Sequence, residues 1–176
     1  MGVSDYRLDE LRKIIGYVPQ KNVLFTGDIA DNLNFGNENG TENDWKTAAE
    51  IACASEFVEK KDGTYHCAVS QGGTNFSGGQ RQLLTIARAI IADPEIMILD
   101  EATSNVDAHT EQAIQNAMAV LLKGRTSFVI AHRLSTIKDA DMILYMENGD
   151  IKEVGDHDTL MKRGGKYAVL YNSQFA

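Results

Sequence analysis

The 176-residue sequence has little cysteine: Cys53 and Cys67 are its only two, and they form neither a C-x-x-C pair nor a metal-binding spacing. Two isolated cysteines indicate free thiols in a reducing compartment. No apolar run approaches the roughly 20 residues that a membrane-spanning helix needs. Polar sequence follows Met1 and Gly2, so we expect no signal peptide. We therefore expect a soluble chain that needs another component to anchor it at a membrane.

Basic residues are also scarce, since 17 Lys and Arg face 25 Asp and Glu, for a net charge of −8 and a pI near 4.9. Nucleic-acid binding needs clustered Lys and Arg, so we expect no nucleic-acid partner. A nucleotide site remains open, because backbone N–H groups and one Lys can suffice for phosphate. The 43% of hydrophobic residues is enough for one domain with a core.

Short apolar runs alternate with helical patterns in the second half of the chain, which indicates an α/β fold with a mostly parallel sheet. The segment from about 25 to 91 lacks clear strands and is interpreted as a helical lobe inserted between two parts of the sheet. Strands are predicted at residues 14–18, 96–99, 127–131, 142–146 and 151–154. Helices are predicted at 44–53, where Asp44 would be the cap, at 83–92, at 110–122 and, as two short ones, in the tail 157–175.

Two carboxylates, Asp100 and Glu101, follow the apolar run at residues 96–99. Ligands of open α/β sheets bind at the carboxyl ends of the strands. One carboxylate there can hold Mg²⁺, and the next can orient or deprotonate a water molecule. The alternative is a strand that ends in a solvated acidic turn.

Ser77, Gly78, Gly79 and Gln80 precede a predicted long helix. Ser77 is a suitable N-cap, and the glycines let backbone N–H groups approach an anion at the helix N-terminus. The segment therefore predicts a phosphate-binding turn. An ordinary capped helix behind a flexible loop would have the same pattern.

His132 and Gln20 each follow a predicted strand, so both are expected at the same sheet edge as Asp100 and Glu101. A histidine there can hydrogen-bond a phosphate or a catalytic water. Gln20 could coordinate a metal ion or hydrogen-bond a water molecule. Taken singly, each residue has a plainer explanation, as a structural histidine and as a loop glutamine.

In this order and spacing, the segments resemble the ATP-binding cassette (ABC) family over the whole chain. Phe76 replaces the family's usual Leu, and Asn105-Val106 stand where Ala-Leu is commoner. Five segments carry the resemblance: 17–20 (Tyr-Val-Pro-Gln, the Q-loop), 75–82 (Asn-Phe-Ser-Gly-Gly-Gln-Arg-Gln, the signature motif), 96–101 (Walker B), 104–107 (Ser-Asn-Val-Asp, the D-loop) and 131–136 (Ala-His-Arg-Leu-Ser-Thr, the switch-histidine loop).

The resemblance implies a P-loop NTPase (RecA-like) parallel-sheet core with an inserted helical subdomain. It divides the chain into a core segment at 1–24, a helical subdomain at 25–92 and a second core segment at 93–176. The implied activity is ATP hydrolysis with Mg²⁺ by two cassettes, identical or different, that close head to tail on two ATP molecules.

The resemblance also assigns roles to single residues. Glu101 would be the general base, and His132 would contact the γ-phosphate. Gln20 and Asp100 would hold Mg²⁺ and water. Asp107 would couple the two ATP sites. Ser77, Gly78, Gly79 and Gln80 would reach the ATP held by the partner cassette.

Segments 23–29, 154–160 and 167–174 resemble exporter cassettes that work with a transmembrane domain of the same or a partner chain. This implies a place at the cytoplasmic face of the cell membrane. Ser70-Gln71 stand where such exporters usually carry Gly-Glu, which suggests altered cross-talk between cassettes. A soluble ABC ATPase of DNA repair or translation remains an alternative, as does a non-enzymatic fragment that only dimerises or docks.

The phosphate-loop pattern G-x-x-x-x-G-K-[ST] does not occur in this sequence. The only Gly-Lys pair, Gly165-Lys166, is followed by Tyr167 and has Leu160 where the first Gly would stand. The family places this loop upstream of the Q-loop, and only 19 residues precede Gln20. We therefore expect a chain that is truncated before its Walker A loop and inactive alone.

Overall fold

The computed structural model describes residues 2–100, 106–131 and 137–174. The α-helices are α1 (Leu8–Ile14), α2 (Ile29–Asn34), α3 (Glu42–Ile51), α4 (Ser55–Glu59), α5 (Gly78–Ala92), α6 (Ala108–Leu122), α8 (His157–Arg163) and α9 (Lys166–Gln174). The strands are β1 (Ile15–Val18), β2 (Gly27–Asp28), β3 (Ala68–Val69), β4 (Ile96–Asp100), β5 (Thr126–Ile130), β6 (Ile143–Glu147) and β7 (Asp150–Gly155). Short 3-10 helices span Val3–Asp5, Thr64–His66 and Gln71–Gly73.

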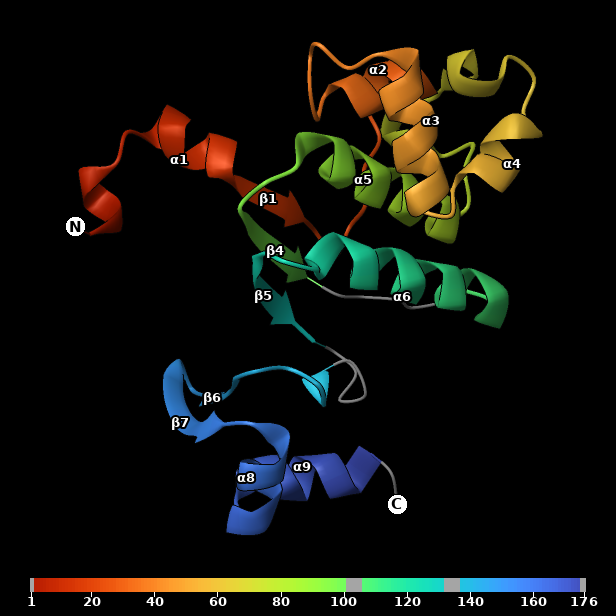
Figure 1. Ribbon diagram of the computed structural model, residues 1–176. Helices are drawn as coiled ribbons and strands as arrows, with labels where there is room; N and C mark the ends of the chain where they lie inside the picture. Colours follow the sequence, from red (N-terminus) through yellow and green to blue (C-terminus); the bar gives the residue numbers. More distant parts are fainter. Residues whose placement is uncertain (1, 101–105, 132–136, 175–176) are drawn as a thin grey trace. The chain divides into compact units, whose positions relative to one another are not determined.

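The chain forms two compact units, Met1–Ile130 and Ala131–Ala176. The first unit contains the elements from α1 to β5, and the second contains β6, β7, α8 and α9 (Figure 1). The division into segments 1–24, 25–92 and 93–176 stays a prediction.

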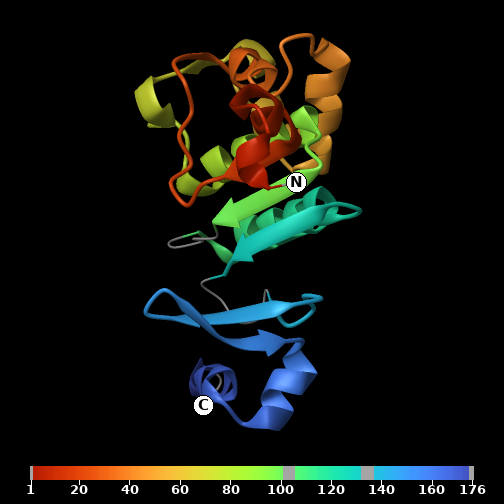
Figure 2. The ribbon, with the colours of Figure 1, turned by 90° about the vertical axis from the view of Figure 1, so that its left-hand side faces the viewer.

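A parallel three-stranded sheet in the order β1-β4-β5 lies in the first unit. Val18 pairs with Leu99, and Leu99 pairs with Val129, so the three strands end at one edge. Figure 2 shows β4 (green) and β5 (teal) side by side and pointing the same way. The predicted parallel α/β arrangement is confirmed, with strand ends that differ from the predicted ones by about one residue.

The segment between β1 and β4 is mainly helical, as predicted, and α5 is its centre, with α2, α3 and α6 packed against it. The buried face of α5 includes Leu83, Leu84, Ile86 and Ala87. The two-residue strands β2 and β3 pair antiparallel and were not predicted, because two residues are too few to show a period.

The predicted cap of α3 is corrected. Thr41 is the N-cap, its Oγ1 accepts a hydrogen bond from the amide of Asp44, and the Asp44 side chain accepts one from the amide of Thr41. This reciprocal capping box explains the error, since Asp44 takes part in the cap from inside the first turn.

A buried asparagine joins α5 to the loop before α2. The Asn32 side chain, with 1% of its surface exposed, accepts a hydrogen bond from the amide of Phe25 and donates to the carbonyls of Phe25 and Asp28, each at 2.8 Å. Arg88 of α5 donates from Nη2 to Asn32 Oδ1 at 2.7 Å and from Nε to the Asn32 carbonyl at 2.9 Å. Burial lowers the pKa of Arg88 to about 10, so the guanidinium remains charged at neutral pH.

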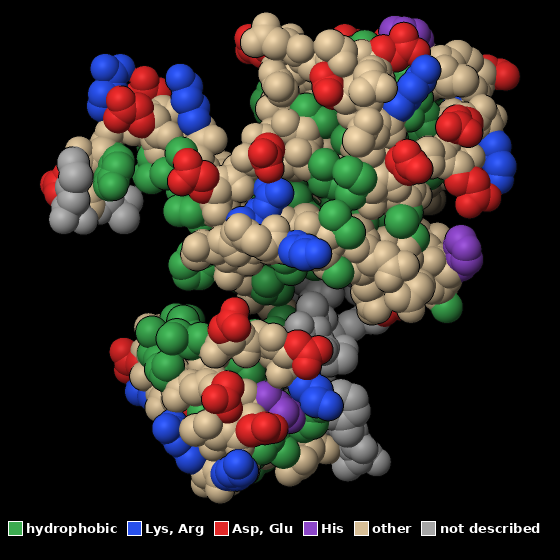
Figure 3. All heavy atoms as spheres, in the orientation of Figure 1, with side chains coloured by type: hydrophobic (Ala, Val, Ile, Leu, Met, Phe, Trp, Pro, Cys, Tyr) green, Lys and Arg blue, Asp and Glu red, His purple; other side chains and the backbone are tan. Residues whose placement is uncertain are grey.

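The second unit consists of an antiparallel hairpin and two helices. Asn148 and Gly149 form the turn between β6 and β7 with φ of 53° and 84°, which confirms the predicted Asn-Gly turn. Ile143, Leu160 and Tyr167 form its buried core. Figure 3 shows apolar side chains gathered at the surface over the hairpin, where exposed residues include Met142, Leu144, Met146, Ile151 and Val154.

No helix within the described ranges has the length and apolar character required to cross a membrane.

Asn32→Ala should destabilise the first unit by about 2–3 kcal/mol. The substitution leaves the amide of Phe25 and the buried Arg88 without their shared acceptor, and each buried polar group that loses its partner costs about 1–3 kcal/mol. Urea unfolding followed by Trp45 fluorescence measures the change. Asn43→Ala, at an exposed position of α3, is the control and should stay within about 0.5 kcal/mol. Equal stabilities of the two variants would contradict the assigned role of Asn32.

Candidate functional site

The carboxyl edge of the parallel sheet carries two of the predicted site residues. Asp100 is the last residue of β4 and is half-buried. Gln20 follows β1, the neighbouring strand, two residues after its end and is exposed. The structure therefore brings Gln20 and Asp100 to the same edge of the sheet, where ligands of open α/β folds bind. Glu101 and His132 lie outside the described residues.

The chemistry of these two side chains suits Mg²⁺. This ion takes oxygen ligands, usually keeps several waters, and is held by one or two protein groups together with substrate phosphates. The Asp100 carboxylate and the Gln20 amide oxygen provide that donor set. Over residues 2–100, 106–131 and 137–174, no group of three or more His, Cys, Asp or Glu side chains is placed to hold a metal ion.

The predicted phosphate-binding turn is the first turn of α5, and Ser77 is its N-cap as predicted. Ser77 Oγ accepts a hydrogen bond from the amide of Gln80 at 3.2 Å, and Gln80 Oε1 accepts one from the amide of Ser77 at 3.1 Å. Both bonds use the side chains as acceptors. This capping box therefore uses neither the hydroxyl hydrogen of Ser77 nor the amide hydrogens of the Gln80 side chain.

The backbone adds further donors to this turn. The first N–H groups of an α-helix have no carbonyl within the helix to bond, and here these include the amides of Gly78 and Gly79. The helix dipole adds partial positive charge at the same place. The turn is thus equipped with hydrogen-bond donors suited to an anion.

The two glycines of this turn have different surroundings. A Cβ at Gly78 would meet only Arg81 Nη2, at 4.0 Å, so the backbone there is open to a ligand. A Cβ at Gly79 would lie 2.3 Å from Thr110 Cγ2 and 3.3 Å from Val106 Cγ1. Gly79 is therefore required for the packing of α5 against α6, a role that the sequence analysis did not assign to it.

The residue just before this turn, Phe76, is held in place by side chains that the sequence analysis missed. Arg81 Nη1 donates to the carbonyl of Phe76 at 2.6 Å. Phe76 is 3% exposed, its ring lies edge-on to Phe57, and Lys61 Nζ is 4.9 Å from its ring centroid. The only signal in the sequence was Phe76 at a position where the resembling family usually has Leu.

The loop that precedes Phe76 is closed by Ser70 and Asn75. Asn75 Oδ1 accepts hydrogen bonds from the amide of Ser70 at 3.1 Å and from Ser70 Oγ at 2.8 Å. Asn75 Nδ2 donates to the carbonyl of Ala68 at 2.8 Å. Ser70 is the first residue of the Ser70-Gln71 pair, which stands where the resembling exporters usually carry Gly-Glu, and it holds the start of the signature motif in place.

Asp107 is the N-cap of α6. Its Oδ1 accepts a hydrogen bond from the amide of Thr110 at 3.0 Å, and its Oδ2 accepts one from Thr110 Oγ1 at 2.7 Å. These bonds hold the pKa of Asp107 below its ordinary value, so the carboxylate is ionised at neutral pH. Ser104 and Asn105, the first residues of the same loop, lie outside the described residues.

The only Gly-Lys pair, Gly165-Lys166, stands at the start of α9, and its surroundings do not suit phosphate. The Glu153 carboxylate accepts the amide of Lys166 at 2.6 Å and the amide of Tyr167 at 3.3 Å, so it takes the place an anion would need. Lys166 Nζ pairs with the carboxylate of Glu147, which raises the pKa of Lys166.

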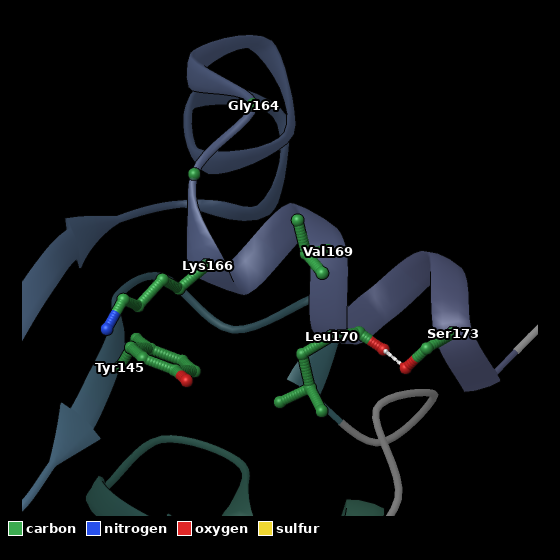
Figure 4. Close-up of a pocket in the computed structure, with 7 residues that line it drawn as sticks. Tyr145, Gly164, Lys166, Val169, Leu170 and Ser173 are labelled. Atoms are coloured by element: carbon green, nitrogen blue, oxygen red, sulfur yellow. Dashed lines mark hydrogen bonds between the residues drawn. The ribbon is translucent and has the colours of Figure 1, made fainter.

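Figure 4 shows the Lys166 side chain beside Tyr145, below α9. Both residues line an open, mostly apolar cavity of about 540 Å³ together with Gly164, Gly165, Val169, Leu170 and Ser173. The backbone and the side chain of Lys166 are thus engaged with carboxylates of the protein, and the expected absence of a Walker A loop stays a prediction.

Comparison with protein families matches residues 2–104 to the family described as ABC transporter. The chain is 47% identical over 165 residues to the uncharacterized ABC transporter ATP-binding protein YfiC of Bacillus subtilis, with 94% of this chain and 27% of that protein covered. It is 47% identical to the beta-(1-->2)glucan export ATP-binding/permease protein NdvA of Rhodopseudomonas palustris, with 99% of this chain and 29% of that protein covered. It is 44% identical to an ATP-dependent lipid A-core flippase of Desulfotalea psychrophila, with 98% and 30% covered.

A solved structure of a bacterial Atm1-family ABC exporter with ATP bound matches the fold with a TM-score of 0.90 at 36% identity. The match covers 99% of this chain and 30% of the exporter chain. The chain thus spans less than a third of the length of the relatives it matches.

Gly79→Ala should destabilise the first unit by about 1–3 kcal/mol, because the new methyl group overpacks against Thr110. Gly78→Ala is the matched control and should change stability little, since its methyl group enters open space. Thr110→Ser removes the methyl group that Gly79→Ala meets, so the double variant should recover most of the loss. Urea unfolding of the four variants tests this, and equal stabilities of the two single glycine variants would contradict it.

Proposed function

We propose that this chain, which belongs to the ABC transporter family, supplies part of the ATP-binding and ATP-hydrolysing cassette of a membrane exporter. Its fold is the P-loop NTPase type of that family, a parallel-sheet core with a helical insertion. Relatives named as glucan exporters and lipid A-core flippases support an exporter, and they give no support to the alternative of a soluble ATPase in DNA repair or translation.

The first turn of α5 is the observation on which the proposal rests. It offers backbone amides at Gly78 and Gly79 and side-chain donors at Ser77 and Gln80, with no acidic residue in the turn. A nucleotide triphosphate is an anion rich in acceptor oxygens, which this turn can bind. In the proposed complex, these residues contact the ATP held by a second cassette.

The carboxyl edge of the sheet would contact the second of the two ATP molecules, the one held by this cassette itself. We assign Gln20 and Asp100 to Mg²⁺ and its waters, since both bring oxygen donors to that edge. When bound, Mg²⁺ would neutralise phosphate charge. We assign Glu101 as the general base that takes a proton from the attacking water, and His132 as a donor to the γ-phosphate.

Asp107 completes the assignment as the residue that couples the two ATP sites. Its ionised carboxylate is held at the start of α6 by the amide and hydroxyl of Thr110. The partners implied are a second cassette and a transmembrane domain of the same or another chain. The cassette would act at the cytoplasmic face of the cell membrane.

The chain of residues 1–176 alone should bind ATP weakly and hardly hydrolyse it. Its sequence contains no G-x-x-x-x-G-K-[ST] segment, which in P-loop NTPases cradles the phosphates. At Gly165-Lys166, the carboxylates of Glu153 and Glu147 already bind the amide and the ammonium group of Lys166. Calorimetry with ATP and Mg²⁺, beside a phosphate-release assay, measures both properties. Micromolar affinity with steady turnover would contradict this prediction.

In the full-length protein, Glu101→Gln should lower ATP turnover by about 10²–10⁴-fold, the usual contribution of general-base catalysis, while ATP binding is retained. Asp100→Asn should instead weaken the Mg²⁺-dependent part of ATP binding. Steady-state phosphate release and ATP titrations with and without Mg²⁺ separate the two effects.

Glu95→Gln is the matched control, since Glu95 is an exposed carboxylate just before the other end of β4, and it should leave turnover unchanged. Turnover by Glu101→Gln within about threefold of the native rate, far inside the general-base range, would show that Glu101 is not the base.

A further inference from the structure

The first turn of α5 at residues 77–80, here called the signature turn, and Asp107 meet at one side chain, Thr110. The helices α5 and α6 pack side by side (Figure 1), and they approach closely at Gly79. A Cβ built on Gly79 would lie only 2.3 Å from the Cγ2 methyl of Thr110. Gly79 is buried in this contact, so the methyl group of Thr110 directly supports the backbone of the signature turn.

The other branch of Thr110 holds Asp107. Thr110 Oγ1 donates to Asp107 Oδ2 at 2.7 Å, and the amide of Thr110 donates to Asp107 Oδ1 at 3.0 Å. Both carboxylate oxygens are therefore fixed by one residue. Threonine is branched at Cβ and stiff at χ1, so its hydroxyl and its methyl group cannot move independently.

We propose that Thr110 is a positioning residue that transmits displacements of Asp107 to the backbone donors of the signature turn at Gly79. Serine offers only the hydroxyl and valine only the methyl group, whereas threonine supplies both contacts. The proposal rests on the proposed function, in which Asp107 and the signature turn belong to coupled ATP sites.

A plain helix cap does not require this contact, as a second cap in the chain demonstrates. Asp156 is the N-cap of α8, and its Oδ1 accepts the amide of Thr159 at 2.8 Å with the same Asp-x-x-Thr spacing. There the threonine methyl lies 3.5 Å from a Cβ built on Gly155, an ordinary contact distance. Capping alone therefore leaves the close approach of Thr110 to Gly79 unexplained.

The first experiment measures whether a change at Asp107 reaches the backbone of Gly79 in the 176-residue chain without nucleotide. Asp107→Ala should shift the amide resonance of Gly79 in a ¹⁵N-labelled sample, whereas the same substitution in a Thr110→Ala background should leave that resonance unchanged. Asp156→Ala is the matched control for the loss of a cap and should not move Gly79. Asp107→Asn, which keeps a capping oxygen, replaces Asp107→Ala if the latter does not fold.

Two results of the first experiment would overturn the proposal. One is a Gly79 resonance that does not respond to substitution of Asp107. The other is a response of equal size when Thr110 is alanine. Neither result depends on ATP, so this experiment decides the coupling even if the full-length protein does not hydrolyse ATP and the proposed function fails.

The second experiment measures ATP turnover by the full-length protein. Thr110→Val and Thr110→Ser should each lower kcat by about tenfold or more, since a misplacement of about 1 Å at a catalytic site can cost about 10²-fold in rate. The KM for ATP should change less than kcat, because Thr110 positions other groups and does not itself bind ATP.

Thr159→Val, at the cap of α8, is the matched control and should keep the native rate. Native turnover by both Thr110 variants would overturn the positioning role. A raised KM with unchanged kcat would also overturn it, because that pattern belongs to a residue that binds ATP.

Discussion

Parallel pairing of β1, β4 and β5 is the constraint on which the arrangement of this chain depends. A chain that enters each strand from the same side must return across the sheet between strands, and α5 and α6 are the two helices that precede β4 and β5. Both helices therefore run in the same direction, with their N-termini at the same end. This places the cap of α6 beside the first turn of α5 and makes the contact of Thr110 with Gly79 possible.

The helix caps of this chain differ in charge, and this difference supports the proposed ligand site at the start of α5. Asp28, Asp107 and Asp156 cap α2, α6 and α8, so these helix dipoles face a carboxylate of the protein itself. At α9, the carboxylate of Glu153 binds the first amides. At α3 the uncharged cap Thr41 is paired with the carboxylate of Asp44. The turn at Ser77 differs because both side chains of its capping box are uncharged, and the box uses their acceptor atoms and leaves their donors.

Local patterns were enough to predict much of the fold. Apolar runs located the strands of the sheet to within about one residue, Ser77 was recognised as a cap, and Asn148-Gly149 was recognised as a hairpin turn. The placement of Gln20 and Asp100 at one edge followed from the expected parallel sheet. These features depend on neighbouring residues or on a rule of topology, both of which a single sequence contains.

Contacts between distant segments were not predictable in the same way. The bond between Asn32 and Arg88 joins two helices that are far apart in the sequence, and either residue alone reads as an ordinary polar position. Gly79 was assigned to anion approach, although the side chain that requires a glycine there belongs to α6. In the proposed function, the glycine pair of this turn meets two separate demands: Gly78 would leave the backbone open to a phosphate oxygen, while Gly79 would let Thr110 hold that backbone in place. A turn that met only the first demand would offer the same donors with nothing to fix their direction, and an anion site gains most from donors that are already oriented before the ligand arrives.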